Sequence, residues 1–142
     1  MREYTYEELE IGQNESFTKE ITAEMENAFR SITGDENPLH KDDGFAGEIS
    51  GGKYSSHVTF GMLTASLYST LAGMYLPGKY SLIHSFDRID FRKPVFVGDV
   101  LTVSGTIHEK QDDLSLIIID ALIKNQNGKV VSKAAMKVIV QR

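Results

Sequence analysis

Two titratable side chains that could move a proton, Asp35 and His40, lie five positions apart and flank the dipeptide Asn37-Pro38. A five-residue spacing does not place them on one helical face. A proline disfavours helical backbone at the residue before it, and Gly34 just upstream is a typical helix end. The pattern therefore predicts a helix end followed by a bend that turns both side chains toward one point. A carboxylate and an imidazole that converge on one water molecule are suited to proton transfer near neutral pH.

The length and composition are those of one globular domain, residues 1–142, long enough to bury a hydrophobic core. The formal net charge of -5 argues against a nucleic-acid-binding protein, which would normally carry a basic face. The absence of cysteine excludes disulfides, thiolate nucleophiles and cysteine-ligated metals. The sequence has no apolar run of signal-peptide type and no stretch near the ~20 apolar residues of a membrane span. We therefore expect a cytoplasmic protein with no nucleic-acid or membrane partner.

Residues 61–76 are the second informative segment, because they carry no charged side chain. Their apolar residues surround nearly the whole helical circumference, which is typical of a helix buried on most sides. Gly73, Pro77 and Gly78 end the segment, which is too short to cross a membrane. The sequence thus predicts one central buried helix.

A further helix and a long loop precede this central helix. Apolar residues recur at helical spacing over residues 23–33, and Thr22 is a suitable N-cap for a helix there. Residues 38–58 contain four glycines and several serines and indicate a loop. Long loops in compact domains are often functional.

The remaining segments have strand character. Asn127-Gly128 is a strong hairpin signal, and the three consecutive isoleucines at 117–119 indicate a strand covered on both faces. Together with the buried helix, these segments predict an α+β domain in which a curved antiparallel sheet wraps around the helix. The expected strands are residues 15–22, 80–93, 98–109, 113–124 and 128–140.

In their order along the chain, these features resemble the MaoC-like hydratases of the hot-dog fold, which include the (R)-specific enoyl-CoA hydratases. The similarity is sharpest in SITGDENPLHKDDGFAG at 31–47, FGMLTASLYSTLAG at 60–73 and FRKPVFVGD at 91–99. Three motifs in matching order are much more specific than one dyad spacing. The resemblance implies a single hot-dog domain with hydratase or dehydratase activity. Such an enzyme adds water reversibly to a trans-2-enoyl thioester and gives the (3R)-3-hydroxyacyl thioester.

The resemblance also implies roles for individual residues. Asp35 and His40 match the family's pair that holds the reacting water, and Asn37 matches a supporting hydrogen-bonding residue. Gly61 occupies the place where a backbone N–H at the start of the central helix receives the thioester oxygen. Ser66 matches a serine one turn further along that contributes to the site. Independent chemistry supports Gly61, because a helix N-terminus suits the enolate oxygen formed when water attacks Cβ.

The chain departs from the family at Phe60, where many members carry a histidine before the glycine. This difference bears on the wall of the site and on substrate shape, and we include Phe60 among the supporting residues. His57 lies three residues earlier and could substitute in part, although a loop histidine that faces water is the simpler interpretation. His84 and His108 fall in predicted strands without a partner pattern. Four scattered histidines predict no metal site.

We expect no cofactor other than the coenzyme A or carrier-protein phosphopantetheine that forms part of the acyl thioester substrate. Lys53, Arg92 and Lys93 could meet the phosphates of coenzyme A, although plain solvation is the simpler interpretation of each. A short sheet around one helix leaves an edge strand and an apolar flank uncovered. We therefore expect a homodimer or a higher homo-oligomer, as the resemblance also implies.

Two other functions compete with hydration. The first is acyl-thioester hydrolysis on the same fold, but hot-dog thioesterases generally place a carboxylate on or near the helix, and residues 61–76 have none. The second is a non-catalytic acyl-binding module. Phe60 favours such a module, whereas the intact set of Asp35, Asn37, His40, Gly61 and Ser66 argues against it.

Overall fold

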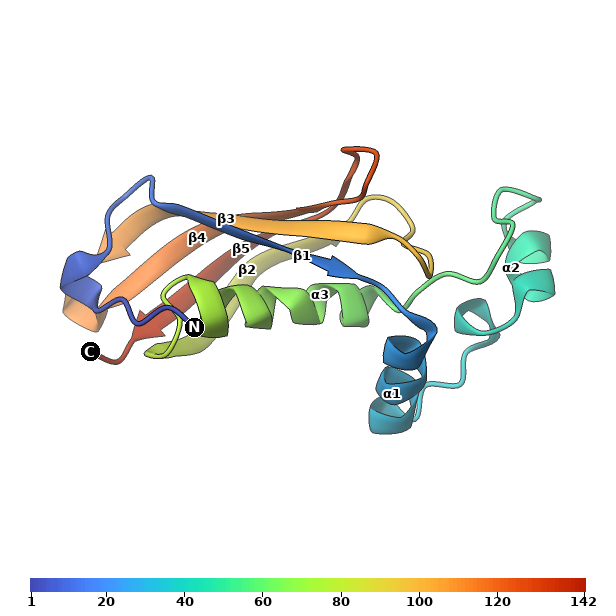
Figure 1. Ribbon diagram of the computed structural model, residues 1–142, viewed down its shortest axis with the longest axis horizontal. Helices are drawn as coiled ribbons and strands as arrows, with labels where there is room; N and C mark the ends of the chain where they lie inside the picture. The colour runs from blue at the N-terminus through green and yellow to red at the C-terminus, as the bar shows by residue number, and fades with distance from the viewer.

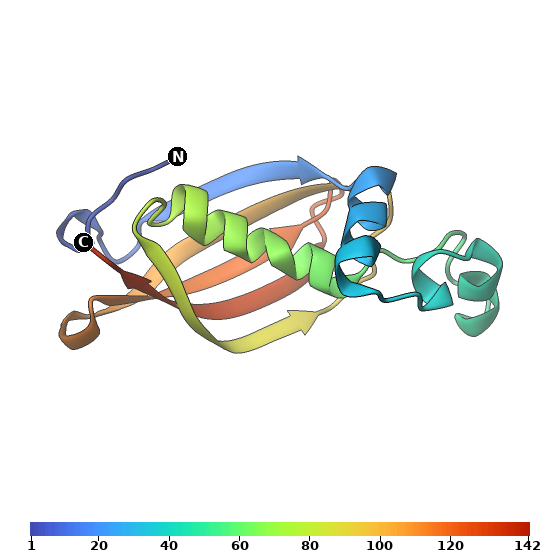
Figure 2. The same cartoon turned by 90° about the horizontal axis from the view of Figure 1, so that it is seen from below.

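The computed structural model describes residues 1–142, and its central feature is a five-stranded antiparallel sheet that curves over one helix (Figure 1). The strands lie in the order β1-β3-β4-β5-β2, so that β1 and β2 form the two edges (Figure 2). This is the α+β hot-dog arrangement expected from the sequence. The strands are β1 (Asn14–Glu20), β2 (Ser81–Phe91), β3 (Val100–Gln111), β4 (Leu116–Lys124) and β5 (Val130–Val140).

The helix beneath the sheet is α3, Gly61–Thr70, which continues into a π-helical turn (η3) at Leu71–Tyr75. One side of α3 is buried against the sheet through Leu63, Leu67 and Tyr68. Its opposite side stays open, because Met62 is 61% exposed and two serines further along are exposed as well. The predicted burial of this helix is therefore correct for the sheet side only.

The isoleucine run on β4 also differs from expectation. Ile117 and Ile119 are fully buried on the helix side of the sheet, whereas Ile118 on the other face is only half-buried. The strand is therefore covered by α3 on one face and partly open on the other, as antiparallel sheets commonly are. The Asn127-Gly128 hairpin between β4 and β5 is present as predicted, with Gly128 at φ +71°.

The segment between β1 and α3 forms a helical extension at the N-terminal end of α3. Helix α1 spans Ala23–Thr33 as predicted, and Thr22 Oγ1 accepts a hydrogen bond from Met25 N at 3.3 Å. Residues 38–58 are not one loop, because they contain a 3₁₀ turn (η2, Pro38–His40) and helix α2 (Asp43–Ile49).

The sequence pattern missed α2 for a local reason. Asp42 caps the helix, since its Oδ1 accepts from Phe45 N at 2.9 Å. The two glycines inside it, Gly44 and Gly47, are poor helix formers and hid the cap signal.

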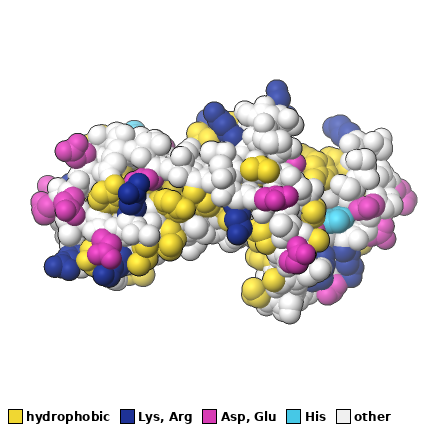
Figure 3. All heavy atoms as spheres, in the orientation of Figure 1, with side chains coloured by type: hydrophobic (Ala, Val, Ile, Leu, Met, Phe, Trp, Pro, Cys, Tyr) yellow, Lys and Arg dark blue, Asp and Glu magenta, His cyan; other side chains and the backbone are white.

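These elements leave apolar surface below the sheet. Helix α1 crosses close to the N-terminal end of α3, and α2 extends further out (Figure 2). Hydrophobic side chains gather along the underside of the molecule, where α3 lies (Figure 3). None of the helices combines the length and apolar character that a membrane crossing requires.

The close packing of α3 and its π-helical turn against the sheet depends on Gly105 in β3. A Cβ atom at this position would lie 2.7 Å from Leu71 Cδ2 and 2.8 Å from Ile119 Cγ2, both on fully buried side chains. We therefore expect Gly105→Ala to lower the free energy of unfolding by about 1–3 kcal/mol, the usual cost of overpacking a core. Urea denaturation measures this loss. Unchanged stability would mean that Leu71 and Ile119 repack freely.

Candidate active site

Asp35 and His40 both line one small cavity at the C-terminal end of α1. The helix stops at Gly34, which has φ +72°, and the chain then bends through η2. Asp35 Oδ1 accepts from Asn37 N at 3.0 Å and so stabilises the bend. Both titratable side chains line this small cavity, which we call the dyad cavity. It has a volume of about 190 Å³ and is lined by Phe29, Thr33, Asp35, His40, Phe60, Gly61 and Met62.

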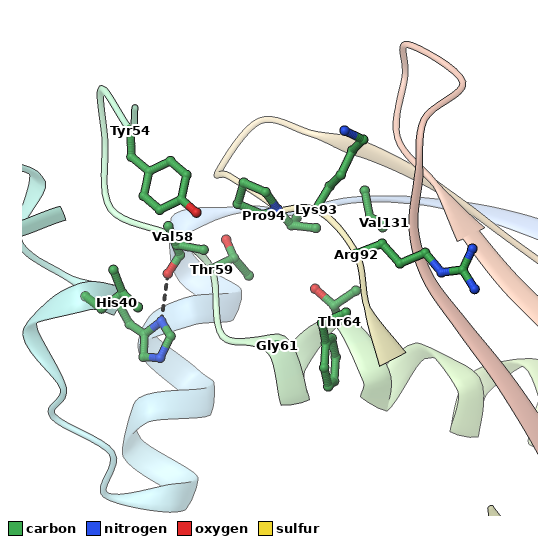
Figure 4. A pocket seen from close by; sticks show the side chains of 13 residues that line it. His40, Tyr54, Val58, Thr59, Gly61, Thr64, Arg92, Lys93, Pro94 and Val131 are labelled. Carbon is green, nitrogen blue, oxygen red and sulfur yellow. Dashed lines mark hydrogen bonds between the residues drawn. The ribbon is translucent and has the colours of Figure 1, made fainter. Parts of the chain in front are cut away.

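The imidazole of His40 is held with one nitrogen free. Its Nδ1 lies 2.8 Å from the carbonyl oxygen of Val58 (Figure 4). Because a carbonyl only accepts hydrogen bonds, Nδ1 carries the proton, and in the neutral ring Nε2 then has a lone pair available. The ring packs on Phe60 with centroids 4.3 Å apart, and the Arg30 guanidinium donates to the His40 carbonyl at 3.0 Å. His40 is thus oriented to accept a proton at Nε2.

The N-terminus of α3 supplies backbone donors beside this imidazole. Phe60 is the N-cap residue and makes no side-chain cap. The first N–H groups of a helix have no partner within the helix, and the helix dipole makes this end attractive to negative charge. Gly61, the first helical residue, lines the dyad cavity together with His40. Its missing side chain leaves room for the Phe91 ring, which would lie 3.3 Å from a Cβ atom there.

Two further hollows adjoin the dyad cavity. The mouth cavity, about 280 Å³, shares His40 and Gly61 with it, and Figure 4 shows its lining. The apolar groove, about 450 Å³, lies between α3, α1 and β2 and shares Phe29, Thr33 and Met62 with the dyad cavity. The three hollows therefore follow one another, with the two titratable side chains in the middle. The groove is lined by Phe29, Thr33, Met62, Ala65, Ser66, Ser69, Ile83, Phe86 and Ile89.

The three predicted supporting residues, Asn37, Ser66 and Phe60, lie in different parts of the site. Asn37 Oδ1 accepts from Leu39 N at 3.0 Å, so this side chain shapes the bend. Ser66 lies in the apolar groove, and its hydroxyl donates to Leu63 O at 2.6 Å. Phe60 is buried and packs against both His40 and Phe29. Of the three, only Phe60 touches the catalytic candidates through its side chain.

Sequence reasoning did not single out Thr64. This residue is 2% exposed, and its hydroxyl has no hydrogen-bond partner. It lies three residues after Gly61 on α3 and lines the mouth cavity with Gly61 and His40 (Figure 4). A buried hydroxyl without a partner is rare in folded proteins, and it is available here to a molecule in the cavity. The available signal was a polar residue one turn into a helix without charged residues, and the serines that follow it gave the same signal.

His57 does not face water as expected, because it is held between two carboxylates. Its Nε2 lies 2.8 Å from Glu26 Oε1 and its Nδ1 lies 2.7 Å from Asp43 Oδ1. Burial alone would lower the pKa of His57, but the hydrogen bonds and charges of Glu26 and Asp43 outweigh it and raise this pKa. The hydrogen bond from the His57 backbone N–H in turn lowers the pKa of Asp43. Glu26 itself is only 3% exposed.

Basic side chains stand at the mouth cavity. Arg92 and Lys93 both line it, and their charged ends point away from it in Figure 4. Two guanidinium nitrogens of Arg92 lie 3.1 Å from the Asp90 carboxylate, which lowers the pKa of Asp90. Lys53 is exposed and is not among the lining residues. No group of three or more His, Asp or Glu side chains is arranged to hold a metal ion.

Comparisons with known proteins place this geometry in context. The family model for the MaoC-like domain matches residues 8–120. An (R)-specific enoyl-CoA hydratase of Aeromonas caviae is 36% identical over 84% of this chain and 87% of the relative. A 3-hydroxybutyryl-CoA dehydratase of Methylorubrum extorquens is 35% identical over 77% of this chain and 67% of the relative.

Solved structures agree with the sequence comparisons. The (R)-hydratase structure from A. caviae superposes with a TM-score of 0.85 at 32% identity, covering 93% of this chain and 97% of that one. An unliganded R-hydratase of Pseudomonas aeruginosa gives a TM-score of 0.87 at 28% identity, covering 97% of this chain and 86% of that one.

Proposed function

The chain belongs to the MaoC-like domain family, and we propose that it catalyses the reversible addition of water to a trans-2-enoyl thioester. The product is the (3R)-3-hydroxyacyl thioester, and the enzyme is a lyase of the hydratase type. The observation that carries the proposal is one cavity that joins Asp35, His40 and the N-terminus of α3 at Gly61. A relative named as an (R)-specific enoyl-CoA hydratase supports the reaction and its stereochemistry, and one named as a 3-hydroxybutyryl-CoA dehydratase supports the reaction.

The N-terminus of α3 stabilises the charge that develops during attack. When water oxygen bonds to Cβ, the electron pair of the double bond moves toward the carbonyl, and negative charge collects on the thioester oxygen. We place this oxygen against the Gly61 N–H, where the helix dipole favours an anion. The Thr64 hydroxyl lines the neighbouring part of the cavity and gives the bound thioester a second polar contact.

Asp35 and His40 handle the proton as a pair. The water is held between the free Nε2 of His40 and the Asp35 carboxylate, whose Oδ1 also accepts from Asn37 N. One proton leaves this water as its oxygen bonds to Cβ, and the pair returns a proton to Cα, so that the net change is addition of one water. We assign the role of base to the pair, because both side chains line the cavity that holds the water.

The two adjoining hollows determine how the substrate lies across the dyad cavity. The acyl chain fits the apolar groove, which is lined by hydrophobic side chains and by the exposed serines of α3. The thioester carrier, coenzyme A or carrier-protein phosphopantetheine, then leaves through the mouth cavity past Arg92 and Lys93. No cofactor beyond this carrier is required for the reaction. A cytoplasmic location is part of the proposal, since the chain lacks the cysteine framework of many small secreted domains.

The experiment that tests the function follows enoyl absorbance with crotonyl-CoA and with longer enoyl-CoA esters. Loss of absorbance with formation of the (3R)-hydroxyacyl ester is the expected result. A thiol reagent in a parallel assay measures hydrolysis of the thioester bond. Release of coenzyme A without loss of the double bond would instead identify a thioesterase, and binding without either reaction would identify an acyl-binding module.

Removing either member of the dyad should abolish most of the activity. We expect Asp35→Asn and His40→Gln each to lower kcat by roughly 10²–10⁴-fold, the usual contribution of general acid–base catalysis. Glu36→Gln is the matched control, because this neighbouring carboxylate is exposed and paired with Lys41. Near wild-type turnover of a folded Asp35 or His40 variant would remove that residue from the mechanism.

A substitution at Gly61 should lower the hydration activity more than it lowers the stability of the fold. A side chain there meets the half-exposed Phe91 ring, which can yield, but it also crowds the thioester at the helix entry. We expect Gly61→Val to lower single-turnover hydration by ~10²–10³-fold, the cost of losing one oxyanion donor. Gly73→Ala is the control, since a Cβ atom there meets nothing within 4 Å. A Gly61 variant that melts early but hydrates normally would make this glycine a packing residue.

We also propose that the protein is at least a homodimer. The edge strand β2 and the open side of the apolar groove beside it both favour self-association, and a second copy that pairs along β2 would close the groove over the bound acyl chain. Light scattering should give at least twice the chain mass of 15.8 kDa. Ser69→Arg adds a charge within the groove and should lower this mass to that of the monomer. Ile11→Arg, at an exposed site outside the groove, should leave the mass unchanged. A monomeric wild-type protein at micromolar concentration would contradict the proposal.

A further inference from the structure

A buried carboxylate that the mechanism above does not use lies behind the active site. Glu26 on α1 is 3% exposed, and each of its two oxygens accepts one hydrogen bond. His57 Nε2 donates to Oε1 at 2.8 Å, and Thr59 Oγ1 donates to Oε2 at 3.0 Å. Burying a carboxylate is costly unless it is paired, so this side chain is committed to these two donors.

The two donors flank Val58, the residue whose carbonyl holds the active-site imidazole. His40 Nδ1 donates to Val58 O at 2.8 Å, and Val58 N donates to Leu39 O at 2.9 Å. Glu26 thus accepts hydrogen bonds from His57 and Thr59, the residues immediately before and after Val58, whose carbonyl selects the His40 tautomer. Its own helix, α1, leads at its other end into Asp35.

A second carboxylate fixes His57 from the outer side. Asp43 Oδ1 accepts from both His57 Nδ1 at 2.7 Å and His57 N at 2.8 Å. Since Nδ1 and Nε2 both face carboxylate oxygens, both carry protons, and the ring is an imidazolium. Asp43 lies on α2, so this ring joins α1, α2 and the segment that enters α3.

We propose that Glu26 is a positioning residue for hydration: through His57 and Thr59 it holds the Val58 carbonyl against Nδ1 of His40, which leaves Nε2 free to take the proton. The inference rests on the proposed function for its kinetic consequence and on geometry alone for its structural one. Without Glu26, the remaining bonds that hold Val58 and its two neighbours are those of Val58 N to Leu39 O, of Thr59 N to Val95 O and of His57 to Asp43.

The kinetic test compares Glu26→Gln with wild type. Glutamine keeps the shape of the side chain but cannot accept from both donors with carboxylate strength. Displacing a catalytic group slightly costs up to 10²-fold, so we expect kcat to fall by roughly 10- to 100-fold with KM within about twofold. Asp120→Asn is the matched control, because Asp120 pairs with an exposed histidine, His108, and neither residue lines any of the three cavities. It should keep wild-type kcat.

The spectroscopic test does not depend on activity. Long-range ¹H–¹⁵N correlation spectra of histidine-labelled protein report which ring nitrogen of each histidine is protonated. Wild type should show His40 protonated at Nδ1 when neutral and His57 protonated at both nitrogens. Glu26→Gln should give His40 a mixture of tautomers, and Asp120→Asn should not.

The outcomes separate this inference from the proposed function. A folded Glu26→Gln protein with wild-type kcat and an unchanged His40 spectrum would overturn the inference while leaving the hydratase intact. A wild-type protein that does not hydrate enoyl thioesters would overturn the function, and the His40 spectrum would still decide the inference. If Glu26→Gln does not fold, Thr59→Val removes one of the two bonds and should lower kcat and mix the tautomers to a smaller extent. If Thr59→Val shows neither a lower kcat nor a mixture of His40 tautomers, the inference is overturned.

Discussion

The burial of an uncharged helix beneath a curved antiparallel sheet is the constraint on which the rest of this structure depends. Leu63, Leu67 and Tyr68 fix the rotation of α3 against the sheet, and Gly105 sets how closely its far end approaches. Once the helix axis is fixed, its N-terminal N–H groups can lie in only one place. The chain provides no side-chain cap at Phe60, so these donors remain for a ligand. The helical extension of α1, η2 and α2 then brings the titratable side chains to that end of the helix.

Local signals in the sequence predicted the parts of the site that local backbone chemistry controls. Thr22 and Gly34 mark the two ends of α1. Pro38 favours the bend after which Asp35 and His40 line one cavity. The strand boundaries are less well predicted than the strand identities, because strand ends depend on pairing with distant residues. Helix α2 escaped prediction since Gly44 and Gly47 oppose a helix that Asp42 and tertiary packing nevertheless stabilise.

Polar contacts between residues far apart in the sequence could not be predicted from sequence patterns. Glu26 and His57 are 31 positions apart, and no periodicity links them. Taken singly, each has a plain interpretation: a charged residue on an exposed helix face and a loop histidine facing water. The fold instead turns Glu26 inward, where it lacks water and must find donors. The same limit applies to Thr64, whose unpaired hydroxyl has meaning only once the cavity around it is known.

Phe60 shows how a departure from the family pattern is compatible with catalysis. Its ring lies 4.3 Å from the His40 ring and 5.0 Å from Phe29, and the Arg30 guanidinium stands 5.6 Å from its centroid. These contacts brace the imidazole by packing alone, since a phenyl ring has no proton to give and no lone pair to compete with Nε2. A polar side chain at this position could take over part of the proton transfer or hold the water itself. With phenylalanine here, the proposed mechanism leaves both tasks to Asp35 and His40, and it therefore depends more strongly on how these two side chains are oriented.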